Sequence, residues 1–413
     1  MVITGLVFLI WAIWPVATFA GGNLLAVLLA ATGLATGVWL ARNRPGFSPV
    51  ILPFGLFLIW VCASANWSLV DAPLVSGSLA SGDFAVKATA LRFPLTVLAG
   101  GAFIAWAFHS GHFVAVRPLL LLVVGVVALQ GAALLVMSVY RGALLDGTAP
   151  DFLPSAQSFG RNANLFGLAV PVAIGAALTL WPERRGRMIG IGFGVAVLLV
   201  AIRHDALSLM AGMGLAGLSF AWLTLASRSG LRDLFAGVGA SVMVMPILAT
   251  SLAYLPASFV DSLPLSARHR LLIWQATIER IGERPLLGHG LDATRSWTET
   301  YSTRPEWIVD MPEMFSGMPL VPTHPHNMVL HVWVEQGVIG AALLAAACVA
   351  IGRLMPATDR LSTPMRLAIA GVFGVAAAQI VLSYSAWDEI FWSGAAIVIA
   401  SLLLLQRFQS DPA

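Results

Sequence analysis

The sequence predicts an all-α protein, a polytopic membrane bundle that crosses the bilayer about twelve times. Hydrophobic residues make up 58% of its 413 positions and charged residues only 10%, whereas roughly a quarter of the residues of a soluble domain are charged. Because so few charged residues cannot form a water-exposed surface, lipid must cover much of the chain. The net charge of +3 is too small to indicate a nucleic acid partner.

Twelve apolar segments are candidate spans, since a spanning helix needs about 20 mostly apolar residues. The first segment lacks a basic stretch before it and a clear cleavage site after it, so we expect a retained helix rather than a signal peptide. The third and fourth segments are short. The predicted spans lie near residues 3–20, 22–40, 50–65, 93–108, 118–139, 164–181, 187–203, 206–225, 233–255, 327–350, 366–384 and 388–405.

These spans divide the chain into three expected parts. A membrane bundle of about nine spans covers residues 1–255, a large loop covers residues 256–326, and about three spans follow in residues 327–413. With the N-terminus in the cytoplasm, every short cytoplasmic connection carries at least one arginine, as the positive-inside bias predicts. Both chain ends then lie inside, and the large loop lies on the non-cytoplasmic side.

The outer side carries more cationic residues than this bias predicts. Of the 23 cationic residues, 12 fall in cytoplasmic segments and 11 on the other side. Long loops escape the bias, which accounts for the cations of the large loop but not for Arg161 or Arg203. Guanidinium groups suit bidentate recognition of phosphate or carboxylate, so we predict an anionic ligand on the outer side. The outer cations are Lys87, Arg92, Arg141, Arg161, Arg203, Arg268, Arg270, Arg280, Arg284, Arg295 and Arg304.

The large loop contains one predicted amphipathic helix, residues 267–284, with Ser266 as its N-cap and Pro285 at its end. We expect this helix to lie along the membrane surface or on the bundle. Residues 297–318 are rich in Trp, Tyr, Phe and Met. That composition suits a lid that rests on lipid chains.

The strongest local pattern is Thr323-His324-Pro325-His326-Asn327, which ends the loop directly before the tenth span. A histidine there can titrate near neutral pH and act as a general base. Two other interpretations stay open, an interfacial histidine that caps a helix and a metal site. Against a metal, the sequence contains no HExxH motif and no acidic pair with DxD spacing.

The helix after this motif carries further candidates. Asn327 is a candidate N-cap for a helix that begins at Met328. Gly337 and Gly340 have a spacing that permits a neighbouring segment to approach closely. We expect His331, one turn past Asn327, to pack or to make a hydrogen bond.

Several of these residues resemble the bacterial O-antigen ligase family. His326-Asn327, followed after nine residues by Gly-Val-Ile-Gly, is similar to the family pattern H-[NSQ]-x9-G-x-x-G. Three further segments resemble family motifs in the same order, and together the motifs extend from about residue 60 to 345. They are residues 66–71 (NWSLVD, similar to WS-x-D), 159–164 (FGRNAN, similar to F-G-x-N-x-N), and 270–274 with 285–290 (RLLIW and PLLGHG, similar to R-x-x-x-W…PLLGxG).

One segment departs from the family. Where the family has Ser-Arg followed by small residues, residues 202–205 read Ile-Arg-His-Asp. Arg203 carries over and its neighbours do not. The superfamily also contains O-antigen and exopolysaccharide polymerases, which share much of the pattern, and the histidine motif favours a ligase.

The resemblance implies a membrane glycosyltransferase of the bacterial inner membrane with its active site facing the periplasm. Its implied partners are a donor glycan on undecaprenyl diphosphate, an acceptor hydroxyl on lipid A–core or on a growing glycan, and membrane lipids. It implies direct displacement with inversion, with no cofactor and no metal. The implied catalytic residues are His326, Arg270 and Arg161, and the implied substrate-binding residues are Arg203, His324, Asn327, Arg268, Trp67 and Asp71.

Two proteins of other classes remain alternatives. A flippase for polyprenol-linked glycans would also need arginines, but along a central cavity at mid-membrane rather than at the outer ends of the spans. A non-catalytic partner in envelope assembly would tolerate substitution of His326. The sequence also leaves open whether His326 or His324 is the working base.

Overall fold

The computed structural model describes residues 2–46, 49–70, 75–76, 85–86, 88–110, 114–145, 156–181, 183–226, 228–304 and 315–410. These residues form α-helices, most of them joined by short connections, together with one two-stranded antiparallel ribbon; the connection from α12 to α13, between Glu283 and Met328, is long. The helices are α1 Val2–Phe19, α2 Asn23–Asn43, α3 Leu52–Ser64, α4 Thr89–Ser110, α5 Val116–Met137, α6 Arg141–Leu145, α7 Ala156–Leu180, α8 Arg184–Arg203, α9 Leu207–Leu225, α10 Gly230–Ser251, α11 Ala257–Ser262, α12 Leu265–Glu283, α13 Met328–Leu354, α14 Thr363–Leu382 and α15 Glu389–Ser410; the strands are β1 Val75–Ser76 and β2 Ala85–Val86.

Eleven helices in the described part of the chain are long and apolar enough to cross a membrane, by length and composition. The remaining predicted span corresponds to α3, which has 13 residues. The predicted all-α polytopic bundle is confirmed, and the chain is a multi-pass membrane protein. The fourth predicted span is longer than expected because α4, with 22 residues, begins in the polar sequence around Thr89 and Arg92.

Two helix boundaries differ from the prediction. α7 begins at Ala156, inside the polar segment that was expected to precede its span. Within that segment the side chain of Asn162 is completely buried, and its Oδ1 accepts a hydrogen bond from Nε2 of Gln130 at 2.6 Å. α12 starts directly after Pro264, so Ser266 lies inside the first turn and does not cap the helix.

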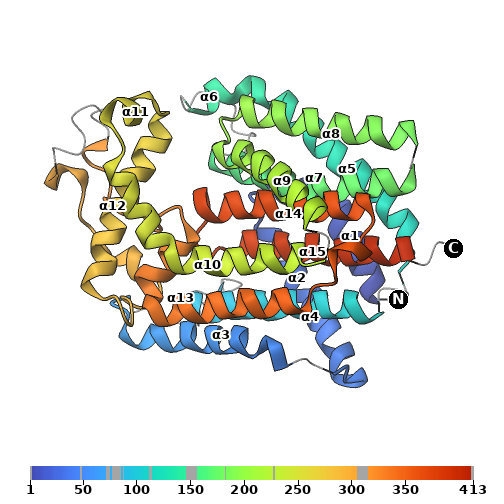
Figure 1. The fold of residues 1–413 in the computed structure, drawn as a ribbon, viewed down its shortest axis with the longest axis horizontal. Coiled ribbons are helices and arrows are strands. Elements are labelled where there is room, and N and C mark those ends of the chain that lie inside the picture. Colours follow the sequence, from blue (N-terminus) through green and yellow to red (C-terminus); the bar gives the residue numbers. More distant parts are fainter. Residues whose placement is uncertain are drawn as a thin grey trace.

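Two buried apolar clusters hold the bundle together. The larger cluster joins α1, α2, α4, α5, α7, α8, α9, the start of α10, α14 and α15. The smaller cluster joins α3, α10, α12 and α13 with the first turns of α4 and α15 and with the connection between α14 and α15. Figure 1 shows α11 and α12, which belong to the large loop, at one end of the bundle, whereas α1 begins and α15 ends at the opposite end.

α13 breaks at Gly337, whose backbone has φ 65° and ψ −171°. Residues 285–290, which we call the docking segment, bind the backbone at this break. The N–H of Val338 donates to the first carbonyl of the segment at 2.8 Å, and the N–H of His289 donates to the carbonyl of Val334 at 2.9 Å. Polar backbone groups that a break would leave unpaired in an apolar environment are thereby satisfied.

This contact brings backbone against backbone and therefore requires glycine. A Cβ on Gly337 would lie 2.2 Å from the carbonyl oxygen of Leu286, and a Cβ on Gly288 would lie 2.4 Å from that of Glu335. Both glycines also have a positive φ, which other residues adopt at a cost. The close approach predicted for Gly337 is confirmed, and a Cβ on Gly340 would likewise meet neighbouring side chains.

We expect Gly337→Ala to lower the thermal unfolding temperature of the detergent-solubilised protein. A positive φ with ψ near 180° is a backbone conformation that essentially only glycine adopts, and it would cost another residue about 1–3 kcal/mol. The new methyl group would also displace the docking segment. The matched control is Gly192→Ala in α8, where no atom lies within 4 Å of the Cβ position. Equal unfolding temperatures for Gly337→Ala and the unsubstituted protein would contradict this account of the break.

Candidate active site

His326 and Arg270 meet at the end of α14. Arg270 lies in the second turn of α12, and His326 lies two residues before α13 begins. Nε of Arg270 donates to the carbonyl of Leu382 at 3.0 Å, and Nδ1 of His326 lies 3.3 Å from the carbonyl oxygen of Ser383. Because these two carbonyls belong to consecutive residues, the structure brings the first two predicted catalytic residues together.

The backbone of His326 is held in the left-handed region, with φ 53°. Its N–H donates to Nδ1 of His324 at 3.1 Å, and the two rings lie edge to face with centroids 4.4 Å apart. A left-handed backbone is strained for a residue with a Cβ and persists where the surroundings fix it, often at functional sites. Here the strain orients the imidazole of His326 toward the end of α14.

The partners of these two rings determine which nitrogen of each carries a hydrogen. A carbonyl oxygen only accepts, so Nδ1 of His326 donates to Ser383 and its Nε2 keeps a lone pair. A backbone N–H only donates, so Nδ1 of His324 accepts and its Nε2 carries the hydrogen. His326 therefore presents a basic nitrogen, and His324 presents a donor.

Burial lowers the pKa of both histidines below the ordinary value, since it disfavours the charged ring. The positive charge of Arg270 lowers the pKa of His326 further. The neighbouring histidines, with Arg295 and Arg161, add to the lowering for His324. Both rings are therefore neutral at physiological pH, which is the state a general base requires.

The guanidinium of Arg270 keeps its charge free for a ligand. Besides Leu382, it donates through Nη1 to the carbonyl of Ser266 at 2.8 Å. Burial lowers the pKa of Arg270, but an arginine retains its proton in proteins. The ion pairs among the described residues do not include Arg270, and no group of three or more His, Cys, Asp or Glu side chains is placed to hold a metal in the same part of the chain.

Arg161 approaches the histidine pair from the polar first turns of α7. After burial, its charge adds to the lowering of the pKa of His324. It also opposes the burial that raises the pKa of Tyr384 and Asp388, both in the connection between α14 and α15. Burial raises the pKa of Asp388, while hydrogen bonds from the first backbone N–H groups of α15 and the charge of Arg161 lower it. The third predicted catalytic residue thus acts electrostatically on His324 and on the connection between α14 and α15.

Glu335 is the residue of this region that the sequence analysis missed. It lies inside α13, is completely buried, and its carboxylate accepts five hydrogen bonds. The donors are the N–H of Asp292 at 2.8 Å, the N–H and Oγ1 of Thr294 at 3.1 and 3.0 Å, Nε1 of Trp387 at 2.7 Å and Nε2 of His331 at 3.0 Å.

His331 links this carboxylate to the histidine pair. Its Nδ1 accepts from the N–H of Ala386 at 3.2 Å, so Nε2 carries the hydrogen donated to Glu335. The ring of His331 lies 6.3 Å from that of His324. The hydrogen-bonding role predicted for His331 is confirmed. The sequence does contain a pattern that could have indicated this hydrogen-bond network. Glu335 lies one helical turn after His331, and both residues are polar within an apolar span.

Asn327 holds the start of α13 next to His326. Its Oδ1 accepts from the N–H groups of Val329 and Leu330 at 3.0 Å, which confirms the predicted N-cap. The side chain is completely buried. Its contacts therefore position the backbone that carries His326.

The other predicted site residues are more dispersed. Arg268 is half-buried in α12. Trp67 lies in a 3-10 turn after α3, with its ring 5.4 Å from a second tryptophan ring of that helix. Arg203 is exposed at the end of α8. Outside the described residues lie Asp71, Lys87 and residues 305–314 of the predicted lid.

The sequence motifs converge on the docking segment. The segment itself binds the break in α13, as described above, and its last residue approaches the turn after α3. A Cβ on Gly290 would lie 2.6 Å from Cα of Ser68, and Oγ of Ser68 donates to the carbonyl of Leu291 at 2.7 Å.

Comparison with known proteins agrees with this arrangement. Residues 159–345 match the family model described as O-antigen ligase. These residues are thus similar to the O-antigen ligase superfamily. The matched O-antigen ligase region begins at the FGRNAN motif and extends past Gly340, so it contains Arg161, Arg270 and the histidine motif.

Several curated relatives carry the name "Putative polysaccharide ligase". That of Rickettsia bellii is 26% identical over 51% of this chain and 50% of its own length. The protein of Rickettsia felis is 26% identical over 59% of this chain and 57% of its own length. The protein of Rickettsia conorii is 28% identical over 44% of this chain and 42% of its own length. The chain thus spans about half the length of the curated relatives it matches. No solved structure matches the chain.

We expect Glu335→Gln in the O-antigen ligase region to destabilise the fold by about 3 kcal/mol. The amide nitrogen of glutamine would face N–H donors, so bonds that the carboxylate accepts would be lost and His331 would lose its partner. Thermal unfolding in detergent measures the effect, with the exposed Glu183→Gln as the matched control. An unfolding temperature for Glu335→Gln equal to that of the control would refute a structural role for the network.

Proposed function

We propose that the chain transfers a glycan from undecaprenyl diphosphate to a sugar hydroxyl, such as one on lipid A–core, at the periplasmic face of the bacterial inner membrane. The observation that carries the proposal is the attachment of His326 and Arg270 to consecutive carbonyls of residues 382 and 383. A basic nitrogen and a buried cation are thereby held side by side. The O-antigen ligase match supports glycan transfer as the reaction class.

In the proposed reaction, Nε2 of His326 accepts the proton of the acceptor hydroxyl as its oxygen bonds to the anomeric carbon of the donor sugar. The bond between that carbon and the phosphate oxygen breaks, and the diphosphate leaves with the electron pair. Attack and departure take place on opposite faces of the sugar, so the configuration inverts. A single displacement suffices because a diphosphate is a good leaving group, and His326 then releases the proton to water.

Two arginines would stabilise the negative charge that develops on the diphosphate. Arg270 would bind it directly, since its charge is not used in an ion pair among the described residues. Arg161 would act from the α7 side of His324, because its charge adds to the lowering of the pKa of that histidine. Arginines suit this task because a guanidinium can bind a phosphate through two parallel hydrogen bonds. With that charge supplied, the reaction needs no divalent metal.

An O-antigen or exopolysaccharide polymerase remains an alternative, because it would use the same donor and base and differ only in the acceptor. A flippase for polyprenol-linked glycans would instead need its cations along a cavity at mid-membrane. The histidine pair and Arg270 belong to the loop and connections at the helix ends. That location favours transfer over transport.

We expect purified protein in nanodiscs to transfer glycan from an undecaprenyl-diphosphate oligosaccharide to lipid A–core in the presence of a chelator. His326→Ala should slow transfer about 10²–10⁴-fold because the general base is lost. Arg270→Ala should slow it about 10²–10³-fold because charge stabilisation is lost. Gel mobility of the capped acceptor measures the product.

The matched control is His109→Ala, which removes an exposed histidine at the end of α4. It should leave the rate unchanged. Lengthening of the lipid-linked glycan without lipid A–core would identify a polymerase. Full activity of His326→Ala, or loss of activity with chelator, would overturn the mechanism.

We expect the pH profile of kcat/KM to rise with pH, with the midpoint of the rising limb below the ordinary histidine pKa of about 6.5. A base works in its neutral form, and burial and Arg270 lower the pKa of His326 below its ordinary value. Arg270→Gln should slow the reaction and also move the rising limb to higher pH, because one of the two causes is removed. If the rising limb lies at the same pH in Arg270→Gln and in the unsubstituted protein, Arg270 does not lower the pKa of His326.

A further inference from the structure

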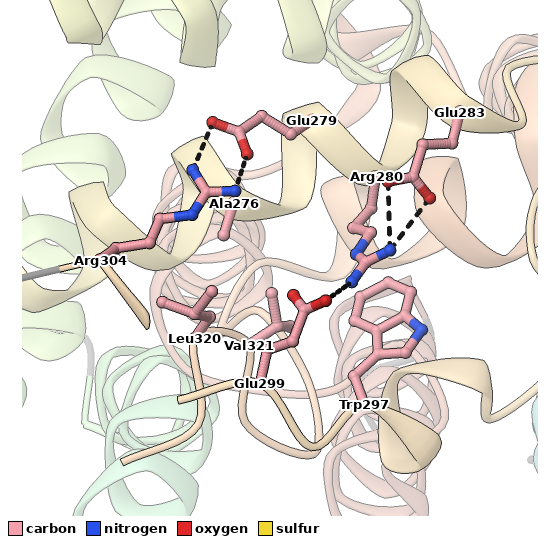
Figure 2. Close-up of a pocket in the computed structure, with 9 residues that line it drawn as sticks. All are labelled: Ala276, Glu279, Arg280, Glu283, Trp297, Glu299, Arg304, Leu320 and Val321. Carbon is pink, nitrogen blue, oxygen red and sulfur yellow. Dashed lines mark hydrogen bonds and ion pairs between the residues drawn. The ribbon is translucent and has the colours of Figure 1, made fainter. Parts of the chain in front are cut away.

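A cavity of about 140 Å³ lies on α12, away from the histidine pair. We call it the α12 cavity. Figure 2 shows its two arginines on opposite sides, each joined to carboxylates, with Trp297 beside one of them. Pockets for drug-sized ligands measure roughly 300–1,000 Å³, so this cavity suits a single ring-sized group. Its lining includes Glu279, Arg280, Glu283, Trp297, Glu299 and Arg304.

The charged groups of the α12 cavity are held in place by one another. Arg280 donates from Nη1 to both oxygens of Glu283 at 3.1 Å and from Nη2 to Glu299 at 2.6 Å. Arg304 donates to both oxygens of Glu279 at 3.1 and 2.7 Å. Each carboxylate oxygen has two lone pairs and therefore keeps capacity to accept from a ligand. The cavity thus presents fixed, planar groups that suit neighbouring hydroxyls.

Charge and shape narrow the class of ligand. Three carboxylates face two guanidiniums, so the cavity disfavours phosphates and other anions. The lining is largely polar, which disfavours a lipid chain. The guanidinium carbon of Arg280 lies over the ring of Trp297, 5.2 Å from its centroid, so the remaining surface of the indole is what can contact a ligand. A pyranose has an apolar face for such a ring and hydroxyls at its edge for the charged groups.

The α12 cavity is connected to the candidate active site in two ways. Arg270 and Arg280 lie on the same helix, about 15 Å apart at about 1.5 Å per residue. Leu320 and Val321, which also line the cavity, lie in the segment that leads to His324. A short oligosaccharide extending from the transfer site could therefore reach the cavity.

We propose that the α12 cavity is a sugar subsite, which binds one pyranose unit bearing hydroxyl or amino groups and no carboxylate. The inference rests on the proposed function, because the bound unit belongs to the glycan that is transferred or extended. The surface of Trp297 that Arg280 leaves uncovered contacts the apolar face of the sugar, and the pairs around Arg280 and Arg304 bind its polar edge. The subsite holds the chain while the reacting end lies at His326.

Direct binding of free trisaccharides tests the subsite without relying on catalysis. The full chain in nanodiscs is titrated with maltotriose, chitosan trisaccharide and trigalacturonate, and saturation-transfer NMR measures binding. We expect binding of maltotriose or chitosan trisaccharide and none of trigalacturonate. Trp297→Ala should weaken binding about tenfold, and Glu299→Gln, a partly exposed position, should weaken it without affecting folding.

Trp181→Ala is the matched control. Trp181 also lies against an arginine, with the guanidinium carbon of Arg185 4.9 Å from the centroid of its ring. It follows the last residue of α7, whereas Arg161 lies near the first residue of that helix. Trp181→Ala should bind as the unsubstituted protein does, and so should His326→Ala. Absence of binding, equal binding by Trp297→Ala, or preference for trigalacturonate would overturn the subsite. If binding fails while transfer proceeds, only the subsite is wrong; if binding holds while His326→Ala transfers glycan, only the mechanism is wrong.

Discussion

The backbone contact between the docking segment and the break in α13 fixes the geometry of the candidate active site. The segment begins where α12 ends, so its attachment sets the position of the helix that carries Arg270. It also holds residues 288–290 against Glu335, one turn from His331. Among apolar helices, a satisfied backbone hydrogen bond has no water to replace it. The contact is therefore confined to a single arrangement.

The buried carboxylate of Glu335 extends this constraint to the base. Its five bonds join the turn at residues 292–294 to α13 and to Trp387. Trp387 lies four residues after Ser383, whose carbonyl receives the imidazole of His326. A buried charge contributes little net stability but can select one packing arrangement over others. We interpret Glu335 as such a residue, remote from substrate and important for the position of the base.

The sequence predicted what depends on composition and local pattern. The spans were predicted from the length of the apolar segments, and the N-cap was predicted from the position of Asn327 before an apolar run. The grouping of His326 with arginines was predicted from the excess of cations on the outer side and from the family resemblance. It did not predict the break at Gly337, the left-handed backbone of His326 or the bonds of Glu335. Each depends on contacts between distant segments, such as Trp387 with Glu335 or Ser383 with His326. The α12 cavity likewise arises from residues that pattern alone does not bring together.

The hydrogen bonds that place Arg270 all end on main-chain carbonyls, those of Leu382 and Ser266. Every residue type supplies the same carbonyl at these positions, so the location of the charge does not depend on which side chains stand there. Substitutions at either position can therefore accumulate without a compensating change elsewhere. The cation is anchored by helix geometry, whereas the paired arginines of the α12 cavity need specific glutamates and can change only together with them.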